Sequence, residues 1–456
     1  MNFIPVMPRP LKKDPGPLTI LNKARNDLLS FWPEDAYRFQ FARRKIINRW
    51  MFIANSPDTV EHVLVTHNDI YERKSPYMRK ALEPLLGDGL FISDGETWRQ
   101  RRELQAPVFH SRNLKPFTET MSTCVMEMAA EWESKYVDQR LLVLPEMAKL
   151  TSEIISRTMF GDELGSKNAG AIVSGFTDYQ AVIEKFDLSS FFGLPEWLPK
   201  MPHRRRGLKV VNRVHEIFDD ILIRNMEKKD MQSTLLSRLL DAYDPTSKDG
   251  ITLEQIRNEA IVIFMAGHET TANALAWAWY LLSNQPSVLE KLHKELHQVL
   301  GSRPPKYEDV SKLKYTRAIF EESMRLYPPV PILSRQSSQE DVIRKKKIPP
   351  GSIMLVVPWL LHRHEQLWDR PHEFIPERFT SEWPTRRQKY SYIPFSAGPR
   401  ICLGAAFGLT EAILCLATLA QRFTLEPVPG YKVGYECRLT LRPKDGLPLI
   451  LRSRNR

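Results

Sequence analysis

The sequence is poor in cysteine, and the cysteines it has are far apart. Only four occur in 456 residues: Cys124, Cys402, Cys415 and Cys437. No two of them have C-x-x-C spacing, so the sequence indicates neither a zinc ribbon nor a disulfide framework. We therefore expect a protein that is kept in a reducing compartment.

Long apolar runs are also missing. No uninterrupted apolar stretch reaches about 18 residues, the length that a membrane-spanning helix needs. The N-terminal segment MNFIPVMPRPLKKDPGP has prolines where a secretory signal needs an apolar core. These absences predict a cytoplasmic protein without a transmembrane segment.

Nothing in the chain has the composition of a linker or the period of a repeat. There is no Gly/Ser-rich or acidic stretch that separates two units. With 42% hydrophobic and 26% charged residues, a chain of this length can bury a large core. We expect a single domain over residues 1–456, with an α-rich core and a small β-rich portion near the N-terminus and after residue 325.

Positive charge is in excess but is not concentrated. Lys and Arg number 65 against 54 Asp and Glu, which gives a formal net charge of +11. The basic residues form short clusters at 43–45, 99–102, 204–206 and 345–347. No zinc finger, RNA-binding motif or basic tail accompanies them, so nucleic acid is not an expected partner. An anionic membrane surface and an acidic protein partner both stay open.

Helical patterns dominate the middle of the chain. Residues 47–64 predict a strand and then a helix, and helical patterns extend from about 98 to 325. The longest predicted helix begins at the capping box formed by Thr252 and Gln255 and ends near residue 284. Strands and loops broken by prolines follow, so the fold class is mainly α with small β-sheets.

One cysteine has neighbours that suggest chemistry. The segment FSAGPRICLG places Cys402 at the start of a long apolar helix. A lone cysteine is most often a buried structural residue. A helix N-terminus, however, favours thiolate over thiol, and Gly398 and Gly404 allow a flat ligand to approach the backbone. A metal-bound thiolate is therefore the alternative to a structural cysteine.

The same segment resembles the F-x-x-G-x-R-x-C-x-G motif of the cytochrome P450 superfamily, the haem-thiolate monooxygenases, in their soluble bacterial form. Phe395, Gly398, Arg400, Cys402 and Gly404 occupy the five fixed positions. The resemblance implies the mainly α fold of that superfamily and haem b (iron protoporphyrin IX) as cofactor. It also implies that Cys402 is the metal ligand and that all five residues contribute to cofactor binding.

A second motif, AGHETTA, lies in the middle of the longest predicted helix. Taken alone, it is equally well explained as a polar interruption of a buried helix. Thr270 can donate a hydrogen bond to the carbonyl of Ala266 and loosen the helix beside Gly267. The motif resembles A/G-G-x-D/E-T of the superfamily, which implies that Glu269 and Thr270 are catalytic and pass protons, while Ala266 and Gly267 contact the cofactor. We expect His268 to pack or to face solvent rather than to bind iron.

A third pattern joins two distant segments. In EESMRLYPP, Glu322 and Arg325 lie three residues apart and thus on one helix face, where an exposed ion pair would add little stability. PERF supplies a further arginine, Arg378. The two segments resemble the E-x-x-R and P-x-R-F motifs, which implies a buried triad that holds the cysteine loop against the core.

A fourth motif provides partners for the two haem propionates. In GETWRQRR, Trp98 and Arg102 are four residues apart, and they offer an indole N–H and a guanidinium group. The W-x-x-x-R motif of the superfamily is similar. Arg400 and Arg335 are the other propionate partners that the resemblance implies.

The implied reaction is insertion of one oxygen atom, R–H + O₂ + two electrons + two protons giving R–OH + H₂O. A thiolate ligand favours O–O cleavage. One alternative is a haem-thiolate peroxygenase or isomerase, although such relatives tend to lose the acid–alcohol pair that this sequence keeps. The other is a non-enzymatic haem protein for electron transfer or sensing, for which we find no sensor or effector segment.

The electrons need a separate donor, because no flavin or iron–sulfur module is evident. We expect an acidic ferredoxin or flavodoxin with its reductase, docked near Cys402. Basic residues Arg99, Arg101 and Arg422 are candidates for this contact.

The substrate chamber is expected to be apolar. The resemblance places these segments around it: 77–91, 176–197, 264–270, 330–333 and 439–441. They are rich in Leu, Phe, Val and Ile, so we expect a lipophilic small-molecule substrate that is a terpenoid, steroid-like or fatty-acyl compound.

Two basic regions have alternative interpretations. Residues 191–206 combine apolar and basic side chains, which suits either weak membrane-surface contact or, as we favour, an exposed lid. Arg73, Lys74, Arg79 and Lys80 could bind a fatty-acid carboxylate, but we expect them to be solvated.

Overall fold

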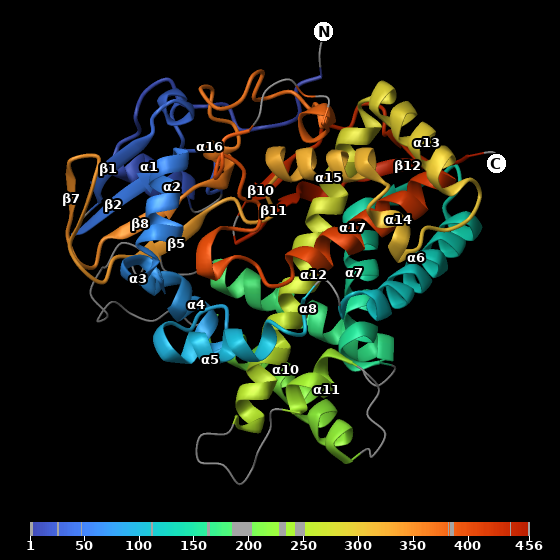
Figure 1. The fold of residues 1–456 in the computed structure, drawn as a ribbon, viewed down its shortest axis with the longest axis horizontal. Coiled ribbons are helices and arrows are strands. Elements are labelled where there is room, and N and C mark those ends of the chain that lie inside the picture. Colours follow the sequence, from blue (N-terminus) through green and yellow to red (C-terminus); the bar gives the residue numbers. More distant parts are fainter. Residues whose placement is uncertain are drawn as a thin grey trace.

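A computed structural model describes most of the chain (Figure 1). The described residues are 3–24, 27–46, 48–110, 113–161, 165–184, 203–227, 234–241, 251–381, 383, 387–437 and 439–454. Residues 191–202 of the predicted lid therefore lie outside the described residues, as do the side chains of 203–206.

Helices account for most of the described structure. The α-helices are α1 (Pro17–Ala24), α2 (Pro57–Glu61), α3 (Asn68–Tyr71), α4 (Pro76–Leu86), α5 (Gly95–Gln105), α6 (Lys115–Lys135), α7 (Val143–Phe160), α8 (Gly165–Glu184), α10 (His203–Glu227), α11 (Leu235–Leu240), α12 (Leu253–Ser283), α13 (Pro286–Leu300), α14 (Tyr307–Val310), α15 (Lys314–Leu326), α16 (Pro358–Leu361) and α17 (Ala405–Arg422). Short helical turns near the site are η2 (His62–Thr66), η4 (Pro376–Phe379) and η5 (Gly398–Arg400).

The strands are short and form several small sheets. They are β1 (Phe41–Ile46), β2 (Arg49–Ala54), β3 (Arg73–Lys74), β4 (Arg140–Leu142), β5 (Leu333–Gln336), β6 (Asp341–Ile343), β7 (Lys346–Ile348), β8 (Ile353–Val356), β9 (Phe423–Pro427), β10 (Tyr435–Cys437), β11 (Leu441–Pro443) and β12 (Pro448–Ser453). The predicted fold class, mainly α with small sheets, is confirmed.

The largest sheet has the order β1-β2-β8-β5-β3. Only the β2–β8 pair in it is parallel, which joins the N-terminal part of the chain to the segment after residue 325. In the β3–β5 pair, Lys74 lies opposite Arg335. The other sheets are β4-β12-β9 and the hairpins β6–β7 and β10–β11. Figure 1 shows the large sheet at one side of the molecule, with α12 crossing the middle.

Helix α12 is the central element of the core. Its N-terminus has the predicted capping box, because Thr252 accepts a hydrogen bond from the Gln255 N–H at 3.2 Å and the Gln255 side chain accepts one from the Thr252 N–H at 3.0 Å. It runs for 31 residues to Ser283, close to the predicted end. Its side chains are buried along most of this length, which a sequence this apolar favours.

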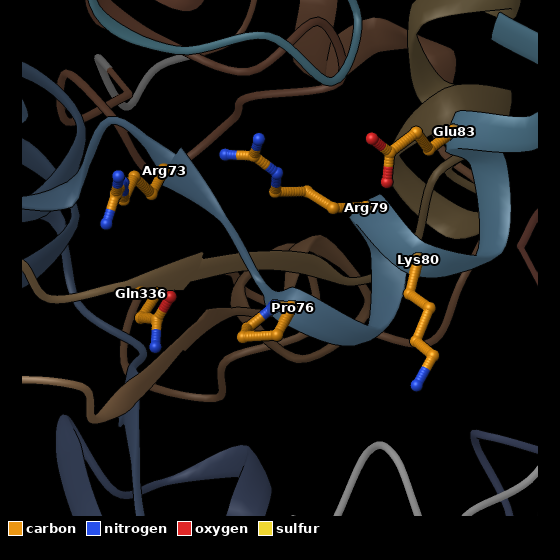
Figure 2. A pocket seen from close by; sticks show the side chains of 6 residues that line it. All are labelled: Arg73, Pro76, Arg79, Lys80, Glu83 and Gln336. Carbon is orange, nitrogen blue, oxygen red and sulfur yellow. The ribbon is translucent and has the colours of Figure 1, made fainter. Parts of the chain in front are cut away.

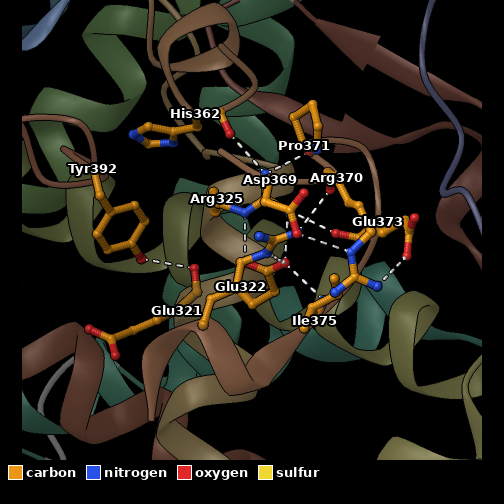
Figure 3. A network of polar contacts seen from close by, with 11 residues as sticks. Glu321, Glu322, Arg325, His362, Asp369, Arg370, Pro371, Glu373, Ile375 and Tyr392 are labelled. Atoms are coloured by element: carbon orange, nitrogen blue, oxygen red, sulfur yellow. Dashed lines mark hydrogen bonds and ion pairs between the residues drawn. The ribbon is translucent and has the colours of Figure 1, made fainter. Parts of the chain in front are cut away.

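The predicted triad of Glu322, Arg325 and Arg378 is formed, and all three side chains are buried. Glu322 accepts hydrogen bonds from Arg325 at 2.6 and 2.8 Å, and its carboxylate lies 3.3 Å from Nε of Arg378. Figure 3 shows that Arg325 also donates to the backbone carbonyls of His362, Pro371 and Glu373. The Glu322 carboxylate thus pairs with both arginines, and backbone carbonyls of the surrounding loop accept further hydrogen bonds from Arg325.

This network extends to the segment that leads to Cys402. The backbone N–H of Ile393 donates to Nε2 of His362 at 2.9 Å. The Tyr392 hydroxyl donates to the Glu321 carbonyl at 2.9 Å, as Figure 3 shows. These contacts tie Tyr392 to α15 and Ile393 to His362, immediately before the cysteine loop.

Replacing Glu322 should be strongly destabilising. Glu322→Gln leaves the guanidinium groups of Arg325 and Arg378 buried without a counter-charge, and breaking a buried ion pair in this way costs about 3–5 kcal/mol. The free energy of unfolding in urea measures it. Glu96→Gln removes an exposed pair with Arg99 and should cost less than about 1 kcal/mol. Equal losses in the two variants would contradict the scaffold role.

Candidate functional site

The cysteine loop depends on a glycine that is packed against another part of the chain. Gly398 has φ +71°, and a Cβ there would lie 1.8 Å from the carbonyl oxygen of Leu64 in η2. No other residue fits this contact. The loop is closed by a hydrogen bond from the Cys402 N–H to the Phe395 carbonyl at 2.9 Å, which directs Cys402 to the start of α17.

Cys402 differs from the other cysteines in accessibility. Its side chain is exposed, whereas Cys124, Cys415 and Cys437 are buried. Desolvation by the surrounding protein nevertheless raises the pKa of the Cys402 thiol, while a backbone hydrogen bond at Gly404 and the charge of Arg102 lower it. Both results follow if the sulfur faces an interior space rather than bulk solvent. A Cβ at Gly404 would meet no atom within 4 Å, so the backbone is also open there.

The AGHETTA segment lies where α12 packs against α17 and α7. A Cβ at Gly408 of α17 would come 3.6 Å from the Thr271 hydroxyl, which brings the cysteine helix next to this segment. Ala266 is exposed although its neighbours on α12 are mostly buried. The Thr270 hydroxyl donates to the Ala266 carbonyl at 2.8 Å, as predicted.

Gly267 and His268, the two residues after Ala266, have different surroundings. A Cβ at Gly267 would lie 3.0 Å from Ile155, so this glycine permits close packing of α12 on α7; its predicted contact with the cofactor stays a prediction. His268 is buried, and burial lowers the pKa of its imidazole to about 4. Its ring stacks on Phe264, so of the two surroundings expected for His268, packing and solvent, the structure shows packing.

The Glu269 side chain reaches a different element. Its carboxylate accepts a hydrogen bond from the Thr440 hydroxyl at 2.6 Å, and Thr440 lies in the turn between β10 and β11. Adjacent helix positions project about 100° apart, so Glu269 and Thr270 are held by separate partners. The arrangement places an acid and a hydroxyl on α12 beside the cysteine helix.

Positively charged side chains gather beside the cysteine loop. Arg335 is buried, and desolvation lowers its pKa to about 9. Desolvation likewise lowers the pKa of Arg400 to about 10. The Arg400 guanidinium lies 4.6 Å from the centre of the Trp98 ring, and Arg102 donates to the Ile401 carbonyl at 2.7 Å. The four predicted propionate partners are thus brought to one region.

Lys74 belongs to the same cluster, and the prediction that it is solvated is wrong. Its side chain is buried, and its pKa is lowered well below the ordinary value, first by desolvation and then by Arg335 and Arg400. Its ammonium lies 4.7 Å from the centre of the Phe91 ring. The alternation of sides along β3 directs Lys74 inward and Arg73 outward, but no pattern in the sequence predicted that these two residues form a strand.

The cluster has groups that suit an anionic ligand. The Nε atoms of Arg335 and Arg400 are buried and have no hydrogen-bond partner among the described residues. Buried cations need an opposite charge and hydrogen-bond acceptors. Haem has two carboxylates together with an iron that accepts a thiolate, so the residues around Cys402 fit this cofactor.

Residues 87–94 connect the cation cluster to α12. Glu259 is fully buried and accepts hydrogen bonds from the Leu90 N–H at 3.0 Å and from Gln105 at 2.6 Å. Desolvation raises its pKa to about 7. Further along, the carbonyl of Ser93 accepts a hydrogen bond from Arg400. A single loop therefore links a buried acid of α12 to the cofactor side of the cysteine loop.

Of the three arginines expected at the docking surface, Arg101 was predicted wrongly. It is buried, and it pairs with Asp88 at 2.9 Å and with Glu259 at 3.2 Å, so it is not available to another protein. Arg99 is exposed and pairs with Glu96. The side chain of Arg422 is mostly covered. Helical spacing alone did not show that Arg101 faces inward and Arg99 faces outward.

No helix in the part of the chain that the structure describes is both long enough and apolar enough to cross a membrane.

Comparisons with known proteins agree with this geometry. Residues 35–445 match the model of the Cytochrome P450 family. Cyclooctatin synthase of Streptomyces melanosporofaciens is 32% identical over 402 residues, which cover 86% of this chain and 84% of that protein. The chloroplastic carotene epsilon-monooxygenase of Arabidopsis thaliana is 28% identical over 425 residues, which cover 88% of this chain and 77% of that protein.

A solved structure is similar over nearly the whole length. The crystal structure of cytochrome P450DA heme domain matches with a TM-score of 0.81 and 26% sequence identity. The match covers 99% of this chain and 98% of that one.

Removing the charge of Lys74 should weaken retention of haem. Lys74→Met keeps the aliphatic stem but removes one cationic donor from the cluster expected to bind the propionates, so haem should dissociate roughly tenfold faster. Transfer of haem to excess apomyoglobin measures the rate. Lys80→Met, an exposed position on the neighbouring helix, is the matched control and should dissociate at the wild-type rate. Identical rates for all three proteins would exclude Lys74 from the haem contact.

Proposed function

The chain belongs to the cytochrome P450 family and is a haem monooxygenase with haem b as its cofactor, and we propose that it inserts one atom of O₂ into a lipophilic substrate. The observation that supports this most directly is the position of Cys402. Its accessible sulfur lies at the start of α17, and α17 packs on α12 beside Thr271, the neighbour of the acid and hydroxyl at Glu269 and Thr270.

The side chains of the site fall into two groups, those that would bind haem and those that would transfer protons. When bound, haem supplies the activation of O₂. Cys402 would hold its iron, and Trp98, Arg102, Arg335 and Arg400 would bind the propionates. Arg335 and Arg400 are buried, which keeps water away from their charges and strengthens an ionic contact to either one.

Proton movement is assigned to the α12 pair. The Glu269 carboxyl can accept and release a proton, and the Thr270 hydroxyl can donate one while it accepts another. The neutral state of His268, whose pKa lies at about 4, leaves Glu269 as the titratable group of this segment that can act as an acid. A peroxygenase or isomerase would have no need for such a pair.

The substrate class is inferred from the apolar walls. Phe264, Ile332 and Leu439 are buried or half-buried members of the segments expected around the chamber. Such walls select by shape and burial, at about 0.8 kcal/mol per CH₂ removed from water. A similar protein is named for a carotene, which is in keeping with a terpenoid. Steroid-like and fatty-acyl compounds have the same apolar character.

A carboxylate anchor is not part of this proposal. A hollow of about 420 Å³ is lined by Arg73, Arg79, Lys80 and Glu83 among others; Figure 2 shows these side chains. Arg73 and Arg79 already pair with Asp94, and Glu83 adds a negative charge to the lining. The hollow therefore has little net attraction for a fatty-acid carboxylate.

We infer further that electrons come from an acidic ferredoxin or flavodoxin with its reductase. The net charge of +11 favours an acidic partner. Arg99 on α5 is exposed, and its helix carries Arg102 beside the cysteine loop. Arg101 and Arg422 contribute less because both are covered.

Domain organisation and compartment are proposed on similar grounds. The main hydrophobic cluster includes buried residues from Leu29 to Leu451, and a second cluster lies in and around the large sheet. Because the main cluster draws on nearly the whole length of the chain, it supports one domain over residues 1–456. All four cysteines are free thiols, as expected in the cytoplasm. Weak contact of residues 191–206 with a membrane surface stays a proposal from sequence.

Cys402→Ala should remove the thiolate-ligated haem. The reduced wild-type protein under carbon monoxide should show the strongly red-shifted Soret band of a thiolate complex, and the variant should lack it. Cys124→Ala, Cys415→Ala and Cys437→Ala are the controls, because their sulfurs are buried away from the site, and should keep the band. Loss of the band in one of these instead would refute the assignment.

Spectral titration should separate an apolar chamber from an anchored one. Dodecanoic acid, its methyl ester and the terpenoid β-ionone should each shift the Soret band, and the acid and ester should bind within about threefold of each other, because exposed, paired arginines contribute little. Arg79→Gln should leave the acid affinity unchanged. Shifts from small polar compounds alone would overturn the lipophilic class, and a much tighter acid would restore the carboxylate anchor.

A further inference from the structure

The contact between Thr440 and Glu269 joins the hairpin β10–β11 to the middle of α12. The Thr440 hydroxyl lies 2.6 Å from a Glu269 carboxylate oxygen. This separation is typical of a hydroxyl that donates to an ionised carboxylate, a stronger contact than one between neutral groups. The two residues are 171 positions apart in sequence, so only the fold brings them together.

The turn that carries Thr440 is held firmly in place. The next residue, Leu441, donates its N–H to the Pro329 carbonyl at 3.0 Å and accepts a hydrogen bond from the Trp277 indole at 3.1 Å. Leu441 also pairs with Cys437 across the hairpin. Thr440 itself is only 8% exposed. Its hydroxyl is therefore placed by the contacts of the next residue with Pro329 and with Trp277 of α12, and it is not an exposed surface group.

A hydroxyl suits an acid that changes its protonation state. It donates to a carboxylate and, after rotation about the C–O bond, accepts from a carboxylic acid. An amide or an ammonium group cannot serve both states without moving. Thr440 can therefore keep the Glu269 side chain in one position through a full cycle of proton uptake and release.

The other member of the pair is held independently. Thr270 donates its hydroxyl proton to the Ala266 carbonyl of its own helix. The Glu269 carboxylate accepts from Thr440, which lies on an element outside α12. That element, the turn at 439–441, is one of the segments expected to line the substrate chamber.

We propose that Thr440 is a positioning residue for proton delivery, and that its hydroxyl holds the Glu269 carboxyl from the substrate-side hairpin in both protonation states. This inference rests on the proposed function, since it assumes that Glu269 passes protons. It assigns a task to a residue outside every motif, and it makes the hairpin part of the proton pathway.

The test uses the full-length holoenzyme with NADPH, a ferredoxin and its reductase, and no organic substrate. Reduction of O₂ then yields either hydrogen peroxide (O₂ + two electrons + two protons) or water (O₂ + four electrons + four protons giving two H₂O). Poor proton delivery favours peroxide and lowers the NADPH:O₂ ratio from two toward one. The solvent deuterium isotope effect on NADPH oxidation is measured alongside, because it reports proton transfer even if the wild type releases mostly peroxide.

Thr440→Val is nearly isosteric and removes the hydroxyl, and Thr440→Ser keeps the hydroxyl. The valine variant should release roughly threefold to tenfold more peroxide per water formed, or show an isotope effect larger by a similar order. The serine variant should behave as the wild type. Carbon monoxide difference spectra and thermal melting establish that each variant is folded and loaded with haem.

Glu269→Gln and Thr270→Ala, assayed in parallel, separate this inference from the proposed function. If both disturb proton delivery while Thr440→Val does not, the positioning role is wrong and the relay stands. If the valine and serine variants are impaired equally, side-chain shape and not the hydroxyl matters, which also overturns the inference. If neither Glu269→Gln nor Thr270→Ala has an effect, the relay itself fails and the role of Thr440 fails with it.

Discussion

Buried positive charge beside Cys402 is the constraint on which the site depends. Lys74, Arg335 and Arg400 come from β3, β5 and the cysteine loop, and desolvation lowers the pKa of each. Collecting like charges away from water is costly unless an anion neutralises them. We propose that the two propionates of haem meet that need, which would couple binding of the cofactor to completion of the fold around it.

Helix α12 connects the parts of the molecule that surround this charge. Near its N-terminus Glu259 holds the loop that reaches Arg400. In its middle, Gly267 lets α7 approach closely, and Glu269 meets the hairpin through Thr440. One rigid element therefore fixes the distances between the buried acid Glu259, the pair Glu269 and Thr270, and the hairpin β10–β11. A shift of α12 would therefore disturb the contacts of Glu259, Gly267 and Glu269 at the same time.

The scaffold and the chemistry are carried by different polar networks. The ion pairs of Glu322 with Arg325 and Arg378 close on themselves and on backbone carbonyls, which leaves no group free to react. The contacts of Glu269 and Thr270 instead involve hydroxyls, which donate and accept equally. A network of paired charges is suited to holding the cysteine loop in place, whereas hydroxyls next to a carboxyl group are suited to proton transfer.

The sequence by itself determined the fold class, the start of α12 at its capping box and the role expected of Cys402, because local spacing and family motifs are short-range properties of the chain. It did not determine which basic residues face inward. Arg101 and Lys74 were expected in solvent, and both are buried, since strand pairing and helix rotation depend on partners far away in sequence. Only the tertiary structure brought Thr440 to Glu269, because a contact across 171 positions follows from how a hairpin packs on a helix and leaves no periodic trace in the sequence.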